Sequence, residues 1–162
     1  MPRLSCWFVR AALLHLGSGV LIGGLLLSAK GFPAALGWAW SLLIAHIQLL
    51  IVGWLIQFAL GVAYWILPRL DGAGERGRPG AAWFSFVALN TGTLLAALAL
   101  SLRAVLPEPW PLVLGGGAAL LQVNAVAAFG WHAWPRLRAL PSPPLAARAT
   151  QAAHISTNPL EP

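Results

Sequence analysis

Two histidines within long apolar segments, His15 and His46, have the clearest capacity for metal chemistry in this sequence. A neutral imidazole in apolar surroundings can bind a heme iron through one ring nitrogen. Strongly polar side chains are costly in such segments and are therefore functional candidates. Five carboxamides share this setting: Gln48, Gln57, Asn90, Gln122 and Asn124. The single cysteine, Cys6, cannot form a cysteine-based metal cluster within one chain.

A stripe of small and polar residues accompanies His46. At 100° per residue in a helix, Gly53, Gln57, Gly61 and Tyr64 fall within about 60° of His46. This stripe is predicted to face protein rather than lipid. One interpretation is structural, with glycines allowing close helix packing and polar groups bonding across it. The other makes the His46 imidazole a heme ligand.

The remaining polar candidates have different expected roles. Gln48 points about 200° away from His46, so we expect it to form a hydrogen bond to another helix. His15 lies roughly 12 Å inside one end of its segment and His46 roughly 8 Å inside the opposite end, so one heme held between them would require strong helix tilts. Packing against small residues is the alternative for His15. His132, beside Trp131, is expected at the membrane interface.

The elements that must position these residues are transmembrane helices. The chain is 59% hydrophobic and only 9% charged, whereas soluble domains have roughly a quarter charged residues. About 20 apolar residues span a hydrocarbon core, and four such segments occur at 7–28, 40–67, 81–102 and 110–134. The sequence therefore predicts an all-α integral membrane four-helix bundle over residues 1–138. Residues 139–162, rich in Pro, Ser, Thr and Ala, are predicted to form a disordered cytoplasmic tail.

The distribution of basic residues predicts the orientation. Eight arginines flank the segments on one side, against Lys30 and Arg103 on the other, so the first side is cytoplasmic and both termini lie inside. We expect a multi-pass protein of the inner membrane, in contact with the lipid bilayer. The net charge of +6 lies between and after the apolar segments, which does not favour nucleic-acid binding. The segments lack acidic or basic residues at mid-depth, which argues against a transporter.

The stretch from His46 to Arg69 resembles the tenth helix of subunit I in the heme-copper oxidase and nitric oxide reductase superfamily. In that family a His-x-His pair opens the helix, small residues follow, and a Tyr-aromatic-x-x-Pro-Arg stretch closes it. Here the matching elements are His46, Gly53, Gly61 and Tyr64-Trp65-Ile66-Leu67-Pro68-Arg69. The resemblance implies that the four segments correspond to the last four helices of that subunit. It also implies that His46 matches the ligand of the high-spin heme, while Gln48 stands in place of the low-spin ligand.

The departures from the family pattern limit the expected activity. The chain has no counterpart of the copper-ligating histidines or of the second-helix heme ligand, so it is not expected to reduce oxygen or nitric oxide alone. We expect a small oxidase-like membrane protein that binds a b-type heme through His46, with His15 a weaker candidate, or that associates with a respiratory electron-transfer complex or as a homo-oligomer. Gln48, Gln57 and Tyr64 are supporting polar residues. The alternative is a cofactor-free assembly or structural subunit that uses these groups for interhelical hydrogen bonds.

Overall fold

A computed structural model of the chain describes residues 1–68, 78–103 and 105–138. Within these ranges the protein is all-helical, and four helical segments are long and apolar enough to cross a membrane: Arg3–Gly31, Pro33–Ile66, Pro79–Ser101 and Trp110–Leu137. The coarse prediction of four apolar helices is therefore confirmed. The predicted tail at 139–162 lies outside the described residues, as does the loop at 69–77.

The first and last helices extend beyond the predicted apolar segments. Helix α1 (Arg3–Gly31) begins before Trp7, and α6 (Trp110–Arg138) continues past Trp134. Pro135 lies inside α6 without ending it. Length prediction from hydropathy stops where charged residues begin, but a helix can continue through them into the headgroup region.

The second crossing is built from several helical segments in sequence. Pro33 opens the short α2 (Pro33–Leu36), followed by a 3₁₀ segment η1 (Gly37–Leu42), α3 (Leu43–Gln48), a π-helical segment η2 (Leu49–Ile56) and α4 (Gln57–Ile66). The π segment has wider turns than an α-helix and shifts the residues after it around the axis. The stripe formed by Gly53, Gln57, Gly61 and Tyr64 is buried along this crossing.

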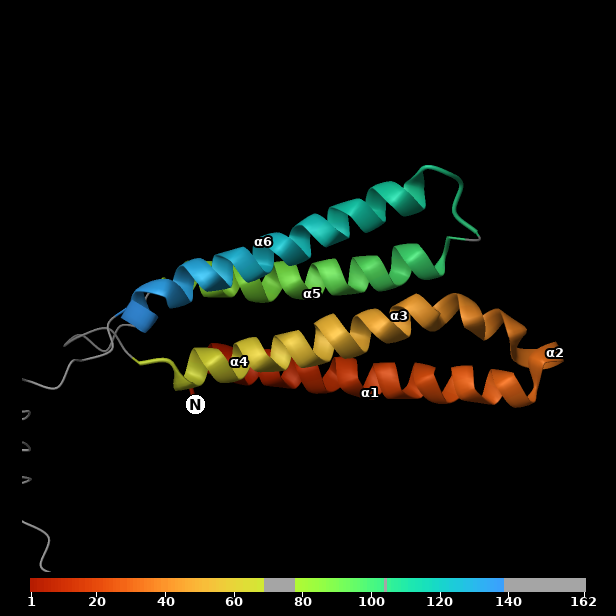
Figure 1. Cartoon of the computed structure of the whole chain (residues 1–162), viewed down its shortest axis with the longest axis horizontal. Coiled ribbons are helices and arrows are strands. Elements are labelled where there is room, and N and C mark those ends of the chain that lie inside the picture. Colours follow the sequence, from red (N-terminus) through yellow and green to blue (C-terminus); the bar gives the residue numbers. More distant parts are fainter. Residues whose placement is uncertain (69–77, 104, 139–162) are drawn as a thin grey trace, which may run out of the picture.

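The four crossings form two antiparallel pairs (Figure 1). Helix α1 runs beside the α3–α4 crossing, and α6 runs beside α5 (Pro79–Ser101). The N-terminus, the end of α4, the start of α5 and the end of α6 lie at one end of the molecule. We call these pairs the first and the second hairpin.

Helix α5 lies at the centre of the packing. Half of its most apolar stretch is buried (50%), against 17% for α6 and 22% for each of the first two crossings. Its buried face consists mainly of small residues, chiefly alanine, together with the fully buried Leu89. A Cβ added to Gly92 would lie 2.9 Å from the carbonyl oxygen of Ala118, so the glycine allows α6 to approach closely.

Aromatic side chains join the two hairpins near the end that contains the N-terminus. Phe8 of α1 is fully buried and contacts Phe86 and Phe129 edge to face, with ring centroids 5.1 and 6.3 Å apart. Leu4, Tyr64, Ala82 and Ala133 complete this cluster, as members of one buried core. The core therefore draws one or more residues from each of the four crossings.

Candidate functional site

His46 lies on α3 and packs against the backbone of α1. Its Nδ1 is 2.8 Å from the carbonyl oxygen of Gly19. A Cβ added to Gly23, one turn further along α1, would lie 2.7 Å from Cε1 of the imidazole. The ring thus occupies space that a side chain on residue 23 would fill, and glycine is required for this approach.

His15 forms the reciprocal contact in the same hairpin. Its Nδ1 is 3.0 Å from the carbonyl oxygen of Gly53 in the π segment, and the side chain is buried. A Cβ on Gly53 would lie 2.6 Å from that nitrogen. Each histidine therefore pairs with a glycine carbonyl on the opposite crossing, and a third bond of this kind joins Ser5 Oγ to the carbonyl oxygen of Gly61 at 2.7 Å.

The hydrogen bonds of His15 and His46 determine which nitrogen of each imidazole ring is available to bind a ligand. A carbonyl oxygen only accepts, so Nδ1 of His15 and Nδ1 of His46 each carry the proton in these bonds. In a neutral imidazole, Nε2 then holds the lone pair. A backbone carbonyl at Nδ1 with Nε2 left for the metal is the usual arrangement of metal-binding histidines. Both imidazoles are thus in the tautomer that a metal ion or heme iron requires.

The two histidines lie at different heights in the interface. His46 contacts α1 at Gly19 and Gly23, which are one and two turns beyond His15. At 1.5 Å per residue these α1 positions lie roughly 6 and 12 Å from His15 along the helix. Each is held by a separate carbonyl, and the structure does not bring them together around one site.

A shallow groove opens beside His46 on the outside of the first hairpin. It measures about 240 Å³ and is also lined by Leu26, Lys30, Trp40 and Leu43. Pockets that enclose small molecules usually measure about 300 to 1,000 Å³. The groove is therefore too small to enclose a heme, and a heme bound by His46 would need a second wall from another molecule.

Two pairs of carboxamides connect the hairpins. Gln57 is fully buried, and its Nε2 donates to Asn90 Oδ1 at 3.3 Å and to the carbonyl oxygen of Phe8 at 3.4 Å. Gln122 Nε2 donates to Gln48 Oε1, also at 3.3 Å. The structure thus places Gln57 and Gln48 in hydrogen bonds between helices and away from the His46 groove.

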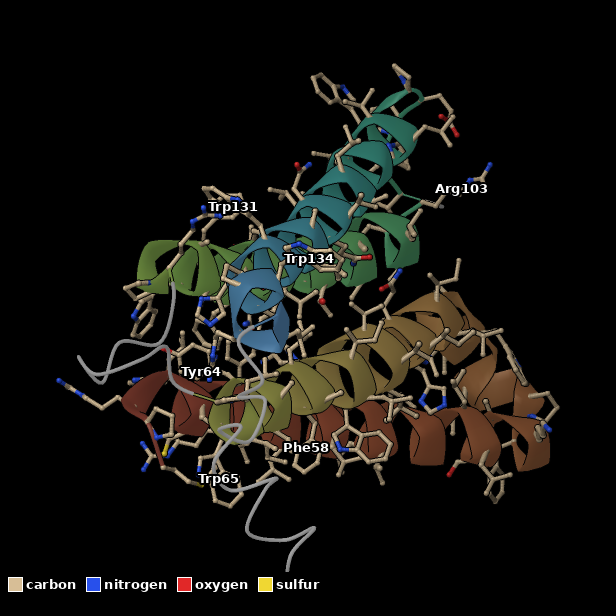
Figure 2. All side chains as sticks on the ribbon, turned by 60° about the vertical axis from the view of Figure 1, so that its left-hand side comes forward. Phe58, Tyr64, Trp65, Arg103, Trp131 and Trp134 are labelled. Atoms are coloured by element: carbon tan, nitrogen blue, oxygen red, sulfur yellow. The ribbon has the colours of Figure 1, made fainter. Side chains whose placement is uncertain are left out.

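Tyr64 belongs to a second polar cluster, at the end of the molecule that contains the N-terminus. Its ring stacks on His132 with centroids 5.1 Å apart, and it points between the hairpins while Phe58 and Trp65 point outward (Figure 2). Arg136 is fully buried and donates to the carbonyl oxygens of Tyr64, Leu67 and Pro68, with the last contact at 2.8 Å. The guanidinium thereby caps carbonyls at the end of α4.

His132 links this cluster to the start of α5. Its Nδ1 donates to the carbonyl oxygen of Arg78 at 3.0 Å, and its Nε2 accepts from Arg136 Nη1 at 3.1 Å. The side chain of His132 is fully buried between the hairpins, and its expected place at the membrane interface stays a prediction. The four-residue spacing of His132 and Arg136, which puts both on one helix face, was the signal in the sequence for this pair.

Within the described residues, no group of three or more His, Cys, Asp or Glu side chains is placed to hold a metal ion. Comparison of the chain with protein-family models, curated proteins and solved structures gives no match.

Proposed function

We propose that this chain is a heme-copper-oxidase-like membrane subunit that presents His46 as an axial ligand to a b-type heme, in association with a respiratory electron-transfer complex. The observation that carries the proposal is the bond from His46 Nδ1 to the Gly19 carbonyl, which leaves Nε2 as the ligand atom. A heme bound there would supply one-electron chemistry. The proposal assigns the chain no oxygen reduction of its own.

The groove beside His46 supports this assignment. Leu26, Leu43 and Trp40 give it apolar walls, and Lys30 gives it a cation that can pair with a carboxylate of a ligand. Because the groove is open, a protein surface of the complex would form the second wall. The single chain would then supply a ligand without enclosing the cofactor.

The proposed orientation places both termini in the cytoplasm and the His46 groove toward the outer surface of the inner membrane. Arg3, Arg78 and Arg136 lie at the end of the bundle that contains the N-terminus, whereas Lys30 and Arg103 lie at the other end. Cytoplasmic ends of membrane proteins carry the excess of basic residues. This distribution supports the assignment.

Reduced-minus-oxidised spectra of the protein purified in mild detergent, with its native partners retained, test the heme. The proposal expects a b-type Soret and α band. His46→Asn should abolish both bands, because the asparagine amide can still donate to the Gly19 carbonyl but offers no imidazole nitrogen to iron. His15→Asn is the matched control and should retain them. A colourless wild-type complex, or bands that survive in His46→Asn, would reject the heme assignment.

A cofactor-free structural subunit is the second candidate function. The observation in its favour is that the His15–Gly53 and His46–Gly19 contacts are complete as packing interactions, each with a hydrogen bond and a tight glycine contact. This candidate predicts colourless protein and similar losses of thermal stability in His15→Ala and His46→Ala. Loss of heme bands in the His46 variants alone would exclude it.

A further inference from the structure

The outward face of α6 has a carboxamide halfway along the helix. Asn124 lies fourteen residues from each end of α6 and is exposed. Its Nδ2 donates one hydrogen bond of 2.8 Å to the carbonyl oxygen of Leu120, one turn earlier. Its second N–H and its Oδ1 have no partner among the described residues. In hydrocarbon, an unpaired hydrogen-bond donor and acceptor raise the free energy, so a polar partner outside the chain would stabilise this side chain.

Asn124 belongs to a regular line of exposed or partly exposed residues that we call the α6 stripe. Its members alternate by four and three residues: Val113, Gly117, Leu120, Asn124, Ala127 and Trp131. Val113, Leu120 and Trp131 are 55–65% exposed. A mean spacing of 3.5 residues is the pattern by which two helices pack along a left-handed crossing, and a single asparagine in such a line fixes the pairing register.

The space around the α6 stripe suits a second helix. A Cβ added to Gly117 would meet no heavy atom within 4 Å, whereas the glycines facing the histidines are filled by contacts within the chain. Beside Asn124, a groove of about 530 Å³ runs between α5 and α6, with the small residues Gly80, Ala81, Ala127 and Ala128 along its walls and the aromatic rings of Phe84 and Trp131 also lining it. Small residues of this kind let a neighbouring helix approach closely.

We propose that two copies of this chain associate through the α6 stripe, with Asn124 of each copy hydrogen-bonded to Asn124 of the other. Copies inserted in the same orientation are related by an axis along the membrane normal, so identical residues meet at the same depth. A carboxamide is self-complementary, because one N–H and one Oδ1 from each side form two reciprocal bonds.

Other occupants satisfy these observations less well. A lipid chain can cover the stripe, but it offers Asn124 no donor or acceptor. Helix α1 also has glycines with open space at Gly17 and Gly24, but that face has no carboxamide. The dimer does not rest on the proposed heme, whose groove lies on the first hairpin.

Cysteine cross-linking of the full chain in its native membrane locates the interface. In a Cys6→Ser background, Ala127→Cys on the stripe should give a covalent dimer on oxidation or with a short bifunctional maleimide. Leu21→Cys, on the outward face of α1 and 77% exposed, is the matched control and should stay monomeric. Disulfide formation requires Cα atoms about 4.4 to 6.8 Å apart, so the reaction reports direct packing.

The role of Asn124 is tested in the same background. Asn124→Val should weaken dimerisation by roughly 3- to 30-fold, the range for interhelical polar contacts in membranes. Thr91→Val, which removes an exposed polar group from α5, should leave dimerisation unchanged. Undiminished cross-linking in Asn124→Val, equal cross-linking from Leu21→Cys, or a monomer that retains a phospholipid in native mass spectrometry would overturn the proposal.

Discussion

The imidazole of His15 lies against the α-carbon of Gly53. The same contact combines a hydrogen bond, 3.0 Å from His15 Nδ1 to the Gly53 carbonyl oxygen, with a separation too short for any side chain on residue 53. The close packing of α1 on the π segment at this point therefore depends on both residues together.

Gly53→Ala should destabilise the protein through this contact. The new Cβ would lie 2.6 to 2.9 Å from Nδ1, Cγ and Cβ of His15, atoms near the root of that side chain that cannot swing away. We expect a loss of about 1 to 3 kcal/mol, as for other overpacked sites, measured as the midpoint of unfolding in a dodecyl sulfate titration.

Two control variants show whether the stability lost in Gly53→Ala comes from its contact with His15. Gly24→Ala, where no heavy atom lies within 4 Å, should be neutral or slightly stabilising because alanine favours helix. In a His15→Ala background, the Gly53→Ala cost should shrink, since the clashing ring is absent. An equal cost in both backgrounds would show that the ring contact is not its cause.

Arg136→Lys should destabilise the end of the bundle that contains the N-terminus, although the charge is kept. A lysine ammonium cannot reproduce the planar fork that reaches three carbonyl oxygens of the second crossing and His132 Nε2. The expected loss is about 2 to 3 kcal/mol in the same titration, from hydrogen bonds to a charged group. Arg103→Lys is the exposed control and should change stability by less than about 1 kcal/mol. Similar losses in both variants would contradict the capping role.

Gln57 and Asn90 should show energetic coupling between the hairpins. Gln57→Leu and Asn90→Leu each remove one side of the 3.3 Å bond, so the double variant should cost less than the sum of the single ones. We expect a coupling of about 0.6 kcal/mol, up to about 2 kcal/mol, from a double-mutant cycle of unfolding free energies. Additive losses would mean that the two amides do not interact in the membrane.

The proposed orientation predicts which sites a membrane-impermeant maleimide can reach. In a Cys6→Ser background, Glu108→Cys should react in intact cells from outside, and Arg3→Cys only after the membrane is opened. Both residues are exposed and lie at opposite ends of the bundle. The reverse labelling pattern would place His46 toward the cytoplasm and remove the orientation part of the proposed function.

The number of helices was predictable because each needs a long apolar run, and the basic residues between the runs mark their ends. The irregular conformation of the second crossing was not predictable from the sequence. Residues 49–56 form a π segment, which the run of apolar residues at these positions does not distinguish from an α-helix. On an ideal helix, His46, Gln57 and Tyr64 fall on one face. The structure instead gives these side chains separate partners: the Gly19 carbonyl oxygen for His46, Asn90 for Gln57 and the His132 ring for Tyr64.

The candidate site was predictable in its residue types but not in its partners. The sequence identifies His15 and His46 as unusual. Their acceptors are backbone carbonyl oxygens, which every residue has, so the sequence cannot identify them except through the glycines at these positions. Arg136 follows the fourth apolar segment, where a basic residue normally extends to water. Its burial became possible only where α4 ends and exposes carbonyls beside it.

The division of polar contacts between the hairpins has a consequence for biogenesis. Ser5, His15 and His46 all find their acceptors within the first hairpin, so this pair can leave the insertion machinery as a finished unit while the ribosome is still translating. Asn90 and Gln122 meet Gln57 and Gln48 only when the second hairpin arrives. Polar matching therefore favours an order of assembly in which the first hairpin forms before the second hairpin packs on it.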